Sequence, residues 1–275
     1  MEKPKDSYIV SLDLDGTILT NEKQVSYRTI ITLLKAKEQG HILVFNTARP
    51  PRDVYAMLPV AFHKDILICY NGALTLQEKK IIGCKPIEKS LMYQLVSMGK
   101  YHGYTKFAIE GCVSKCTSCA NAGCSASLFA NFDCERELGW IPCSYSDFSL
   151  VDFTHILKII VYNQEPDKLI TNERFVKCLP KSTETTITDK DTLIQIVSKG
   201  VTKWQGLQYI QDKYSHKKTM AFGDDNNDIQ IIKNVDVGVA MENGTDKVKE
   251  AAKYITEKSN QHDGVAEFLQ SFLGL

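Results

Sequence analysis

Three short apolar segments of the chain are each followed directly by side chains that can take part in chemistry. Asp13 and Asp15 follow the first segment, Thr47 follows the second, and Asp224 follows the third. If the segments are neighbouring parallel strands, these side chains meet at the carboxyl edge of the sheet, where open α/β sheets bind ligands. Carboxylates that meet repel one another, and a divalent cation relieves the repulsion. Oxygen ligands without histidine favour Mg²⁺.

Magnesium beside a hydroxyl group and a lysine indicates phosphoryl chemistry, because Mg²⁺ readily shares its coordination shell with phosphate. Thr47 supplies the hydroxyl, and Ala48 supplies an amide near the start of a helix, a natural place for an anion. The short loop from Leu14 to Gly16 can turn further amides inward. Asp13 can attack phosphorus, while Asp15 can protonate the leaving oxygen and later deprotonate water. These residues predict catalysis through an aspartyl-phosphate.

Strands and helices must alternate along both ends of the chain to bring these groups together. Segments typical of buried strands and amphipathic helices do alternate there. Strands are expected at 8–12, 41–45, 66–69, 219–222 and 235–240, and helices at 26–40, 52–58, 203–214, 225–233, 246–252 and 265–272. This order predicts an α/β protein with a Rossmann-like, doubly wound parallel sheet, because such crossovers are right-handed.

The middle of the chain has a different pattern, with strands in pairs. Helices are expected near 90–101 and 167–177, strands near 106–109 and 156–162, and a hairpin formed by 183–188 and 193–197. The sequence therefore predicts a core domain made of residues 1–83 and 199–275. Residues 84–198 are expected to form an inserted α+β domain.

The composition is that of a globular protein, with 43% hydrophobic and 24% charged residues. The 33 basic and 33 acidic side chains balance, so no global field draws the chain to nucleic acid or anionic lipid. No signal segment or membrane span is visible, and we expect a cytoplasmic location. The balanced charge therefore predicts neither a nucleic-acid partner nor a membrane partner. The sequence does not indicate an oligomeric state.

Six of the nine cysteines lie between positions 112 and 143. Reduced thiols are the rule in the cytoplasm, so a disulfide framework is not expected. The Cys116–Cys119 pair has a chelating spacing, although a second pair of this kind is missing. Two interpretations stay open. Cys112, Cys116, Cys119 and Cys124 could bind a second metal, zinc or iron, or they could be ordinary thiols.

Taken together, the motifs resemble the haloacid dehalogenase superfamily, specifically its Cof-type phosphatases of subclass IIB. The family motif DxDGT is complete at residues 13–17, and GDxxND is complete at residues 223–228. Thr47 fits the motif between them that supplies a hydroxyl, and Lys203 fits the motif that supplies a lysine. Asn71-Gly72-Ala73 and the stretches 237–243 and 263–266 also resemble the family.

Two segments depart from the family pattern. Thr-Gly-Arg is replaced by Thr47-Ala48-Arg49, in which Arg49 could bind substrate or pair locally. Lys-Gly-x-Ala-Leu is replaced by residues 203–207, which read Lys-Trp-Gln-Gly-Leu. Neither change removes a catalytic group.

The resemblance implies a role for each site residue. Asp13 would be the nucleophile and a Mg²⁺ ligand, and Asp15 would be the general acid and base and bind the metal through its backbone carbonyl. Asp224 would be the third ligand from the protein, with Asp228 behind it. Phosphate would be held by the amides of Leu14 and Ala48, the Thr47 hydroxyl, Lys203 and Asn227. The insert would be a cap that closes over the site and selects the substrate.

The expected function is a Mg²⁺-dependent phosphatase that hydrolyses small phosphorylated metabolites, including sugar phosphates. Two alternatives stay open. The same core could serve a phosphomutase, which returns the phosphoryl group to the substrate. The chain could also be a metal- or redox-responsive binding protein that works through its cysteine-rich segment.

Overall fold

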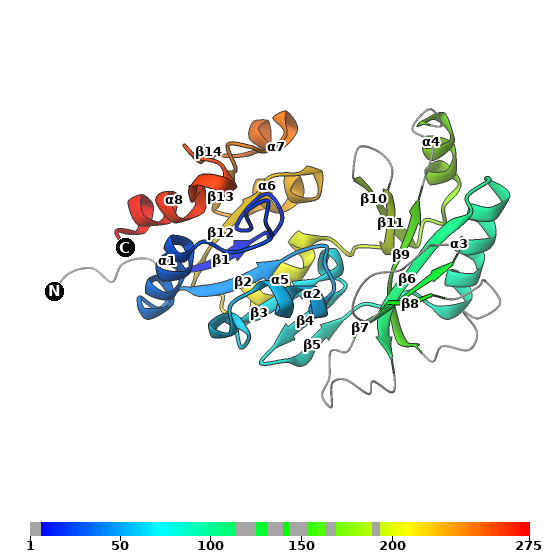
Figure 1. Ribbon diagram of the computed structural model, residues 1–275, viewed down its shortest axis with the longest axis horizontal. Helices are drawn as coiled ribbons and strands as arrows, with labels where there is room; N and C mark the ends of the chain where they lie inside the picture. The colour runs from blue at the N-terminus through cyan, green and yellow to red at the C-terminus, as the bar shows by residue number, and fades with distance from the viewer. Residues whose placement is uncertain (1–6, 114–124, 131–139, 143–152, 163–168, 189–192) are drawn as a thin grey trace. The chain divides into compact units, whose positions relative to one another are not determined.

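The computed structural model describes residues 7–113, 125–130, 140–142, 153–162, 169–188 and 193–275. The chain divides into two compact units (Figure 1). The first contains Met1–Arg49, Asp53–Ile82 and Thr202–Leu275, and the second contains Pro50–Arg52 and Gly83–Val201. Each unit is built on a sheet of its own.

The first unit contains an eight-stranded sheet in the order β14-β13-β12-β1-β2-β3-β4-β5. Its strands are β1 (Tyr8–Leu12), β2 (Ile42–Asn46), β3 (Ile66–Cys69), β4 (Leu74–Gln77), β5 (Lys80–Cys84), β12 (Lys218–Gly223), β13 (Val237–Ala240) and β14 (Tyr254–Ile255). The strands from β14 to β3 in this order are parallel, and β4 pairs antiparallel with β3. The first and last parts of the chain therefore meet at the centre, where β1 lies between β12 and β2.

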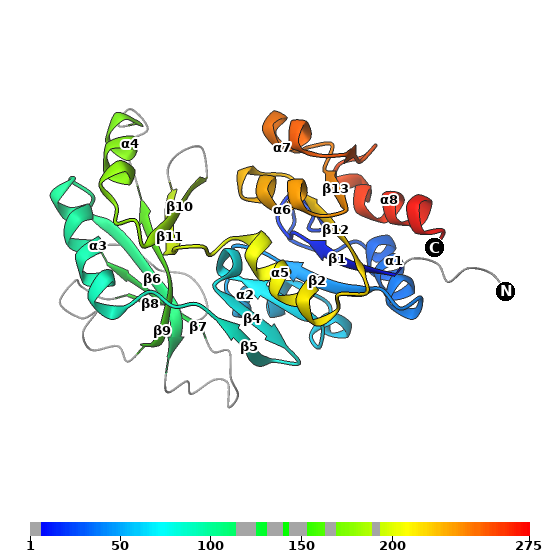
Figure 2. The same ribbon diagram turned by 180° about the vertical axis from the view of Figure 1, so that it is seen from behind.

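Helices cover both faces of this sheet (Figures 1 and 2). They are α1 (Tyr27–Glu38), α2 (Pro51–Met57), α5 (Lys203–Lys213), α6 (Ile229–Asn234), α7 (Asp246–Ala251) and α8 (Gly264–Leu273), with short 3₁₀ turns η1 (Val60–Phe62), η2 (Tyr70–Gly72), η5 (Asn226–Asp228) and η6 (Asn260–His262). Alternate strand residues point to opposite faces. Ile9 packs in the cluster that includes residues of α5, α6 and α7, whereas the ring of its neighbour Tyr8 contacts Phe272 of α8. Such double coverage explains why the parallel strands are almost continuously apolar.

The second unit contains a six-stranded sheet in the order β10-β11-β9-β6-β7-β8, with antiparallel pairing except between β7 and β8. Its elements are α3 (Lys89–Tyr101), β6 (Lys106–Val113), β7 (Ser125–Ala130), β8 (Trp140–Pro142), β9 (Phe153–Tyr162), α4 (Leu169–Cys178), β10 (Thr183–Thr188) and β11 (Leu193–Ser198). Leu95 of α3 and Phe175 of α4 are buried in one apolar cluster with Phe107, Ile159 and Ile196 of the strands. Both helices therefore pack on the same face of the sheet.

These two architectures confirm the predicted fold class, an α/β unit with a mostly parallel sheet and an inserted α+β unit. The hairpin of β4 and β5 was not expected. Its turn residues Glu78 and Lys79 adopt left-handed backbone conformations, with φ of 51° and 63°. Glycine or asparagine usually occupies such positions, so the sequence carries no turn signal there.

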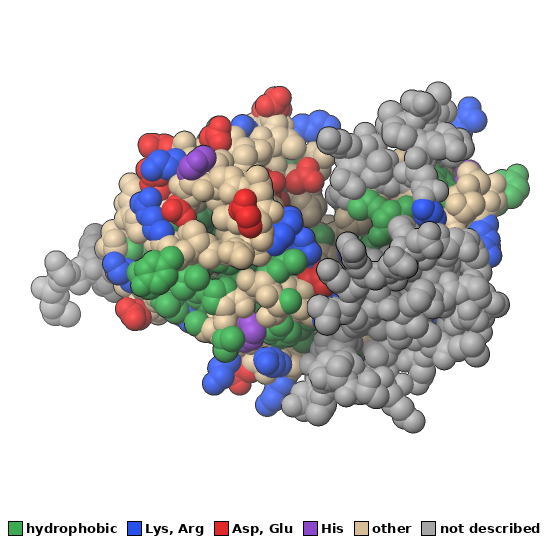
Figure 3. Space-filling view, viewed as in Figure 1, with side chains coloured by type: hydrophobic (Ala, Val, Ile, Leu, Met, Phe, Trp, Pro, Cys, Tyr) green, Lys and Arg blue, Asp and Glu red, His purple; other side chains and the backbone are tan. Residues whose placement is uncertain are grey.

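On the face seen in Figure 3, charged side chains of both signs are interspersed over the first unit, in keeping with the zero net charge. Among the described residues, no helix combines the length and the apolar character that crossing a bilayer requires.

Candidate active site

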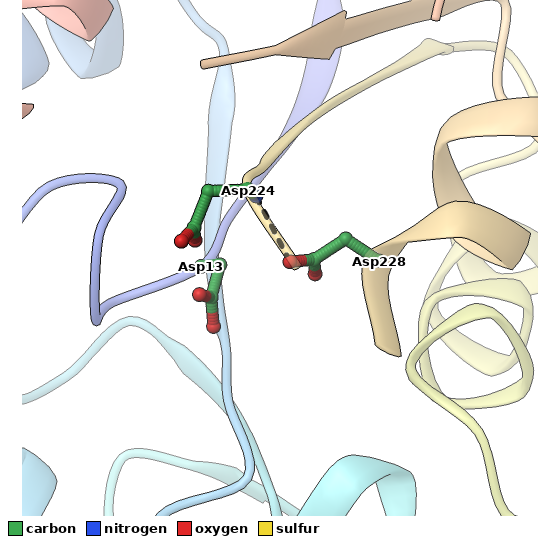
Figure 4. A group of neighbouring side chains, drawn as sticks. All are labelled: Asp13, Asp224 and Asp228. Atoms are coloured by element: carbon green, nitrogen blue, oxygen red, sulfur yellow. Dashed lines mark hydrogen bonds between the residues drawn. The ribbon is translucent and has the colours of Figure 1, made fainter. Parts of the chain in front are cut away.

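Three carboxylates from separate segments gather at the carboxyl ends of the central strands (Figure 4). Asp13 follows β1, Asp224 follows β12, and Asp228 ends the turn η5. One carboxylate oxygen from each of the three lies within 4.8 Å of the others. The parallel pairing of β1 with β12 produces this meeting, since it places Leu12 opposite Phe222 and ends both strands at the same edge. Asp13 and Asp224, expected to converge from the sequence, are therefore brought together.

Asp228 fixes the backbone that carries Asp224. Its Oδ2 accepts hydrogen bonds from the N–H groups of Asp224 and Asp225, at 3.1 and 3.2 Å. The close approach requires glycine at position 223, because a Cβ there would lie 2.3 Å from Cγ of Asp228. The glycine, the first aspartate and the last aspartate of the GDxxND motif thus form one packed turn.

The loop after β1 holds the Asp224 side chain from the other side. Thr17 donates its hydroxyl hydrogen to Oδ1 of Asp224 at 3.0 Å. Gly16 has a φ of +71°, and a Cβ at this position would lie 2.1 Å from Oδ2 of Asp224. Only glycine both tolerates this conformation without strain and leaves the space for the carboxylate.

Lys203 provides a buried positive charge to this group of carboxylates. It is the first residue of α5, whose start is fixed by the Thr202 hydroxyl accepting the N–H of Gln205. The Lys203 ammonium lies 2.6 Å from Oδ1 of Asp13 and 2.7 Å from Oδ1 of Asp228. Burial by itself lowers the pKa of Lys203, but the two carboxylates outweigh it and raise that pKa. The lysine is therefore charged.

The acidic group carries more negative charge than Lys203 compensates. Burial raises the pKa of Asp13 well above its ordinary value, and neighbouring carboxylates add to the effect against the opposing charge of Lys203. Burial and Asp228 likewise raise the pKa of Asp224 to about 7. A bound cation would stabilise the ionised carboxylates, and their oxygen donors are those preferred by Mg²⁺. The residues present therefore fit a hard divalent cation.

Asp15 lies among a different set of partners. Arg49 donates from Nε and Nη2 to its two oxygens at 2.5 and 2.7 Å, and the Lys23 ammonium lies 2.6 Å from Oδ1. Burial opposes ionisation, but the hydrogen bonds and charges of Arg49 and Lys23 outweigh it and lower the pKa of Asp15. The two aspartates of the DxDGT motif thus have opposite electrostatic environments.

The remaining predicted residues lie on the segments that border the carboxylates. Leu14 stands between Asp13 and Asp15, and Thr47 and Ala48 follow β2. The Thr47 hydroxyl accepts the N–H of Arg49 at 3.2 Å. Asn227 precedes Asp228 in η5 and donates its side-chain N–H to Oδ1 of Asn71 at 3.2 Å.

Sequence reasoning missed two contacts of the site. Lys23 carried no signal, because a lone lysine in a loop usually faces solvent. Asn71 was noted as part of a family motif, but its contact with Asn227 was not expected. Arg49 was expected either to bind substrate or to pair locally. In this structure it pairs locally, with Asp15.

The proposed cysteine metal site has no support. Cys116, Cys119 and Cys124 lie outside the described residues. Cys112 is on β6, and burial raises the pKa of its thiol to about 12, which disfavours the thiolate that a metal needs. Within the part of the chain that the structure describes, the group of Asp13, Asp224 and Asp228 is the one cluster suited to a metal.

A doubly wound parallel sheet with this cluster at its carboxyl edge defines an α/β protein whose ligand site suits a divalent cation. The chain belongs to the haloacid dehalogenase-like hydrolases, whose family model matches residues 10–269. Its relatives identify it as a phosphatase of the Cof type, a phosphoric monoester hydrolase, as the motifs predicted.

Individual relatives match over nearly the whole chain. YitU of Bacillus subtilis (strain 168), a 5-amino-6-(5-phospho-D-ribitylamino)uracil phosphatase, is 24% identical over 286 residues, 98% of each chain. The crystal structure of SMU.1108c from Streptococcus mutans UA159 has a TM-score of 0.81 and 19% identity, covering 98% of this chain and 100% of that one. The subclass IIB sugar phosphatase BT4131 has a TM-score of 0.73 and 19% identity, covering 97% and 99%. These comparisons favour neither the phosphomutase nor the binding protein.

Proposed function

We propose that this phosphatase is Mg²⁺-dependent and hydrolyses small phosphorylated metabolites through an aspartyl-phosphate on Asp13. One observation carries the proposal. The Asp13 carboxylate lies 2.6 Å from the Lys203 ammonium and within a cluster of two further carboxylates. An isolated buried aspartate would be protonated and unreactive, whereas Lys203 together with a bound cation would keep the oxygens of Asp13 ionised.

Asp13, Asp224 and the backbone carbonyl of Asp15 would hold the magnesium ion, with Asp228 fixing Asp224 from behind. The bound ion would neutralise charge on the phosphoryl oxygens and lower the pKa of nearby acidic groups. Its ligand set contains no histidine or thiolate among these residues, which is why we expect Mg²⁺ in place of zinc.

The reaction is divided between the two aspartates of the DxDGT motif. One oxygen of Asp13 forms a bond to phosphorus as the bond to the leaving oxygen breaks, and Asp15, protonated once it has left its ion pairs with Arg49 and Lys23, donates a proton to that oxygen. Asp15 then takes a proton from water, whose oxygen binds phosphorus as the bond to Asp13 breaks. Lys203, Asn227, the Thr47 hydroxyl and the amides of Leu14 and Ala48 would hold the phosphoryl oxygens throughout.

The inserted unit would act as a cap, with domain limits at residues 84–198, and would select the part of the substrate beyond the phosphate. A relative that acts on a ribityl phosphate supports a substrate of sugar or polyol type. We therefore propose phosphate monoesters of sugars and sugar alcohols as the first substrates to test.

The test measures phosphate release from p-nitrophenyl phosphate by the full chain with Mg²⁺ and with EDTA. We expect activity only with Mg²⁺ and no turnover by Asp13→Asn. During turnover we also expect the phosphoryl group of the substrate to label Asp13 transiently, with no label on lysine. The control variant Asp212→Asn, at an exposed position on α5, should behave as the wild type. Equal rates with and without EDTA, or full activity of Asp13→Asn, would contradict the proposal.

A further inference from the structure

A strained turn lies beside the phosphate-binding segments, and the mechanism above assigns it no part. Tyr70, Asn71 and Gly72 follow β3 and have successive φ values of 54°, 58° and 106°. Left-handed backbone is costly for an aromatic residue such as Tyr70, which is also fully buried. Residues held in such conformations concentrate at functional sites, where the surrounding contacts stabilise them.

The backbone of this turn joins the segment that carries Thr47. The N–H of Asn71 donates to the carbonyl of Thr47 at 3.1 Å, and the N–H of Tyr70 donates to the carbonyl of Arg49 at 3.2 Å. The turn therefore fixes the backbone on both sides of Ala48, whose amide is proposed to donate a hydrogen bond to phosphate.

The same turn contacts the two other phosphate-binding segments. A Cβ on Gly72 would lie 2.3 Å from the carbonyl oxygen of Thr202, so the turn packs directly on the start of α5, which carries Lys203. Oδ1 of Asn71 accepts the side-chain N–H of Asn227 at 3.2 Å, and Asn71 is buried. Three segments distant in sequence thus meet at one turn.

We propose that Asn71 is a positioning residue of the phosphate site. Its left-handed backbone aligns the Thr47 segment, and its side-chain carbonyl orients the Asn227 amide so that the second N–H of that amide is directed to phosphate. The proposal rests on the phosphate-binding role proposed for Asn227. Asparagine is suited to the position because it tolerates left-handed backbone better than other residues with side chains and also offers an acceptor.

The experiment measures the Kd of inorganic phosphate for the full chain with Mg²⁺ by calorimetry, alongside thermal unfolding. Asn71→Gly keeps the backbone conformation and removes the carbonyl, whereas Asn71→Ala removes the carbonyl and adds backbone strain. We expect both to raise Kd about tenfold, the loss of one hydrogen bond to a charged group, and only Asn71→Ala to lower the Tm markedly. Lys79→Gly, at another left-handed position in an exposed turn, is the matched control and should leave Kd unchanged.

A double-mutant cycle with Asn227→Ala tests whether Asn71 acts through Asn227. We expect Asn227→Ala to raise Kd as much as Asn71→Gly does and the double variant to raise it no further. An unchanged Kd in either single variant, or effects that multiply, would overturn the proposal. Failure of the proposed function is a separate result, because it appears as absence of Mg²⁺-dependent hydrolysis by the wild type.

Discussion

Lys203 and Asp13 form a buried ion pair with an Nζ–Oδ1 distance of 2.6 Å, although 190 positions separate them in the sequence. The same ammonium lies 2.7 Å from Asp228, so one lysine contacts the carboxylates that follow β1 and end η5. Lys203 is 2% exposed, and water cannot replace its charge. The pair therefore links the stability of the first unit to the ionisation of Asp13, the proposed nucleophile.

Replacing Lys203 with methionine removes this charge while keeping most of the side-chain volume. Two buried carboxylates lose their partner, and we expect turnover to fall by about 10²–10³ and stability to fall by about 3–5 kcal/mol. Lys213→Met, at the exposed end of α5, is the control. Steady-state kinetics and urea unfolding measure both effects. A Lys203→Met variant within twofold of wild-type turnover would contradict the role given to Lys203.

The ion pairs of Asp15 predict that the effect of removing its partners on kcat depends on the leaving group of the substrate. Arg49 and Lys23 lower the pKa of Asp15 and hold it ionised, whereas a proton donor must be protonated, so Arg49→Ala and Lys23→Ala raise that pKa. Since proton donation matters most when the leaving oxygen is basic, we expect kcat for glycerol phosphate to rise relative to kcat for p-nitrophenyl phosphate, which needs little acid assistance. Lys37→Ala breaks a comparable ion pair, with Asp65, and serves as the control. Equal changes in kcat for the two substrates would show that these cations do not act through Asp15.

Gly16 allows a test that separates backbone strain from site geometry. Gly16→Ala places a methyl group where the Asp224 carboxylate lies, and we expect turnover to fall by about 10²-fold and Mg²⁺ to bind more weakly. Gly40→Ala has a similar strain, with φ of +86°, but no atom lies within 4 Å of its new Cβ. It should lose about 1–2 kcal/mol of stability and keep its turnover. Similar kinetics for the two variants would refute the argument.

Asp236 predicts a pH dependence of stability. Thr219 donates its N–H and its hydroxyl hydrogen to Oδ2 of Asp236 at 2.7 and 2.8 Å. Burial opposes ionisation, but these hydrogen bonds lower the pKa of Asp236 below its ordinary 3.8. Since the folded-state pKa is the lower one, the contribution to stability is present above pH 3.8 and is lost as the pH falls through the folded-state pKa.

Asp236 is exposed and asparagine keeps an acceptor oxygen, so Asp236→Asn should lower the free energy of unfolding by only about 0.5 kcal/mol at neutral pH, and the difference should shrink below about pH 4. Urea unfolding of both proteins at the two pH values measures it. A difference that grows on acidification would have the wrong sign.

The sequence predicted the elements that carry chemistry because strand ends have a simple signature. A short apolar run followed by Asp13 or Asp224 indicates a buried strand that stops at a polar edge, and parallel pairing then brings the edges together. The features that escaped prediction depend on side chains or backbone conformations without a local signature. The contact of Lys23 with Asp15 is an example. Lys23 is a loop lysine in left-handed backbone, and nothing near it in the sequence indicates that it, rather than another cation, pairs with Asp15.

The turn at Tyr70 escaped for the same reason. Its left-handed conformation contradicts the local preference of an aromatic residue and is stabilised by contacts with Thr47 and Thr202, which are distant in sequence. Such contacts become visible only when the whole unit is assembled.

The pairing of β1 with β12 has a consequence for synthesis on the ribosome. β1 emerges from the ribosome before its neighbour β12, which begins at Lys218, so the two strands can pair only after the residues between them have been translated. Asp13 meets Lys203, Asp224 and Asp228 only after that point, since non-local pairings form late. A nascent chain therefore lacks the assembled carboxylate cluster until residue 228 has been translated, and ribosomal stalling before this residue leaves the site incomplete.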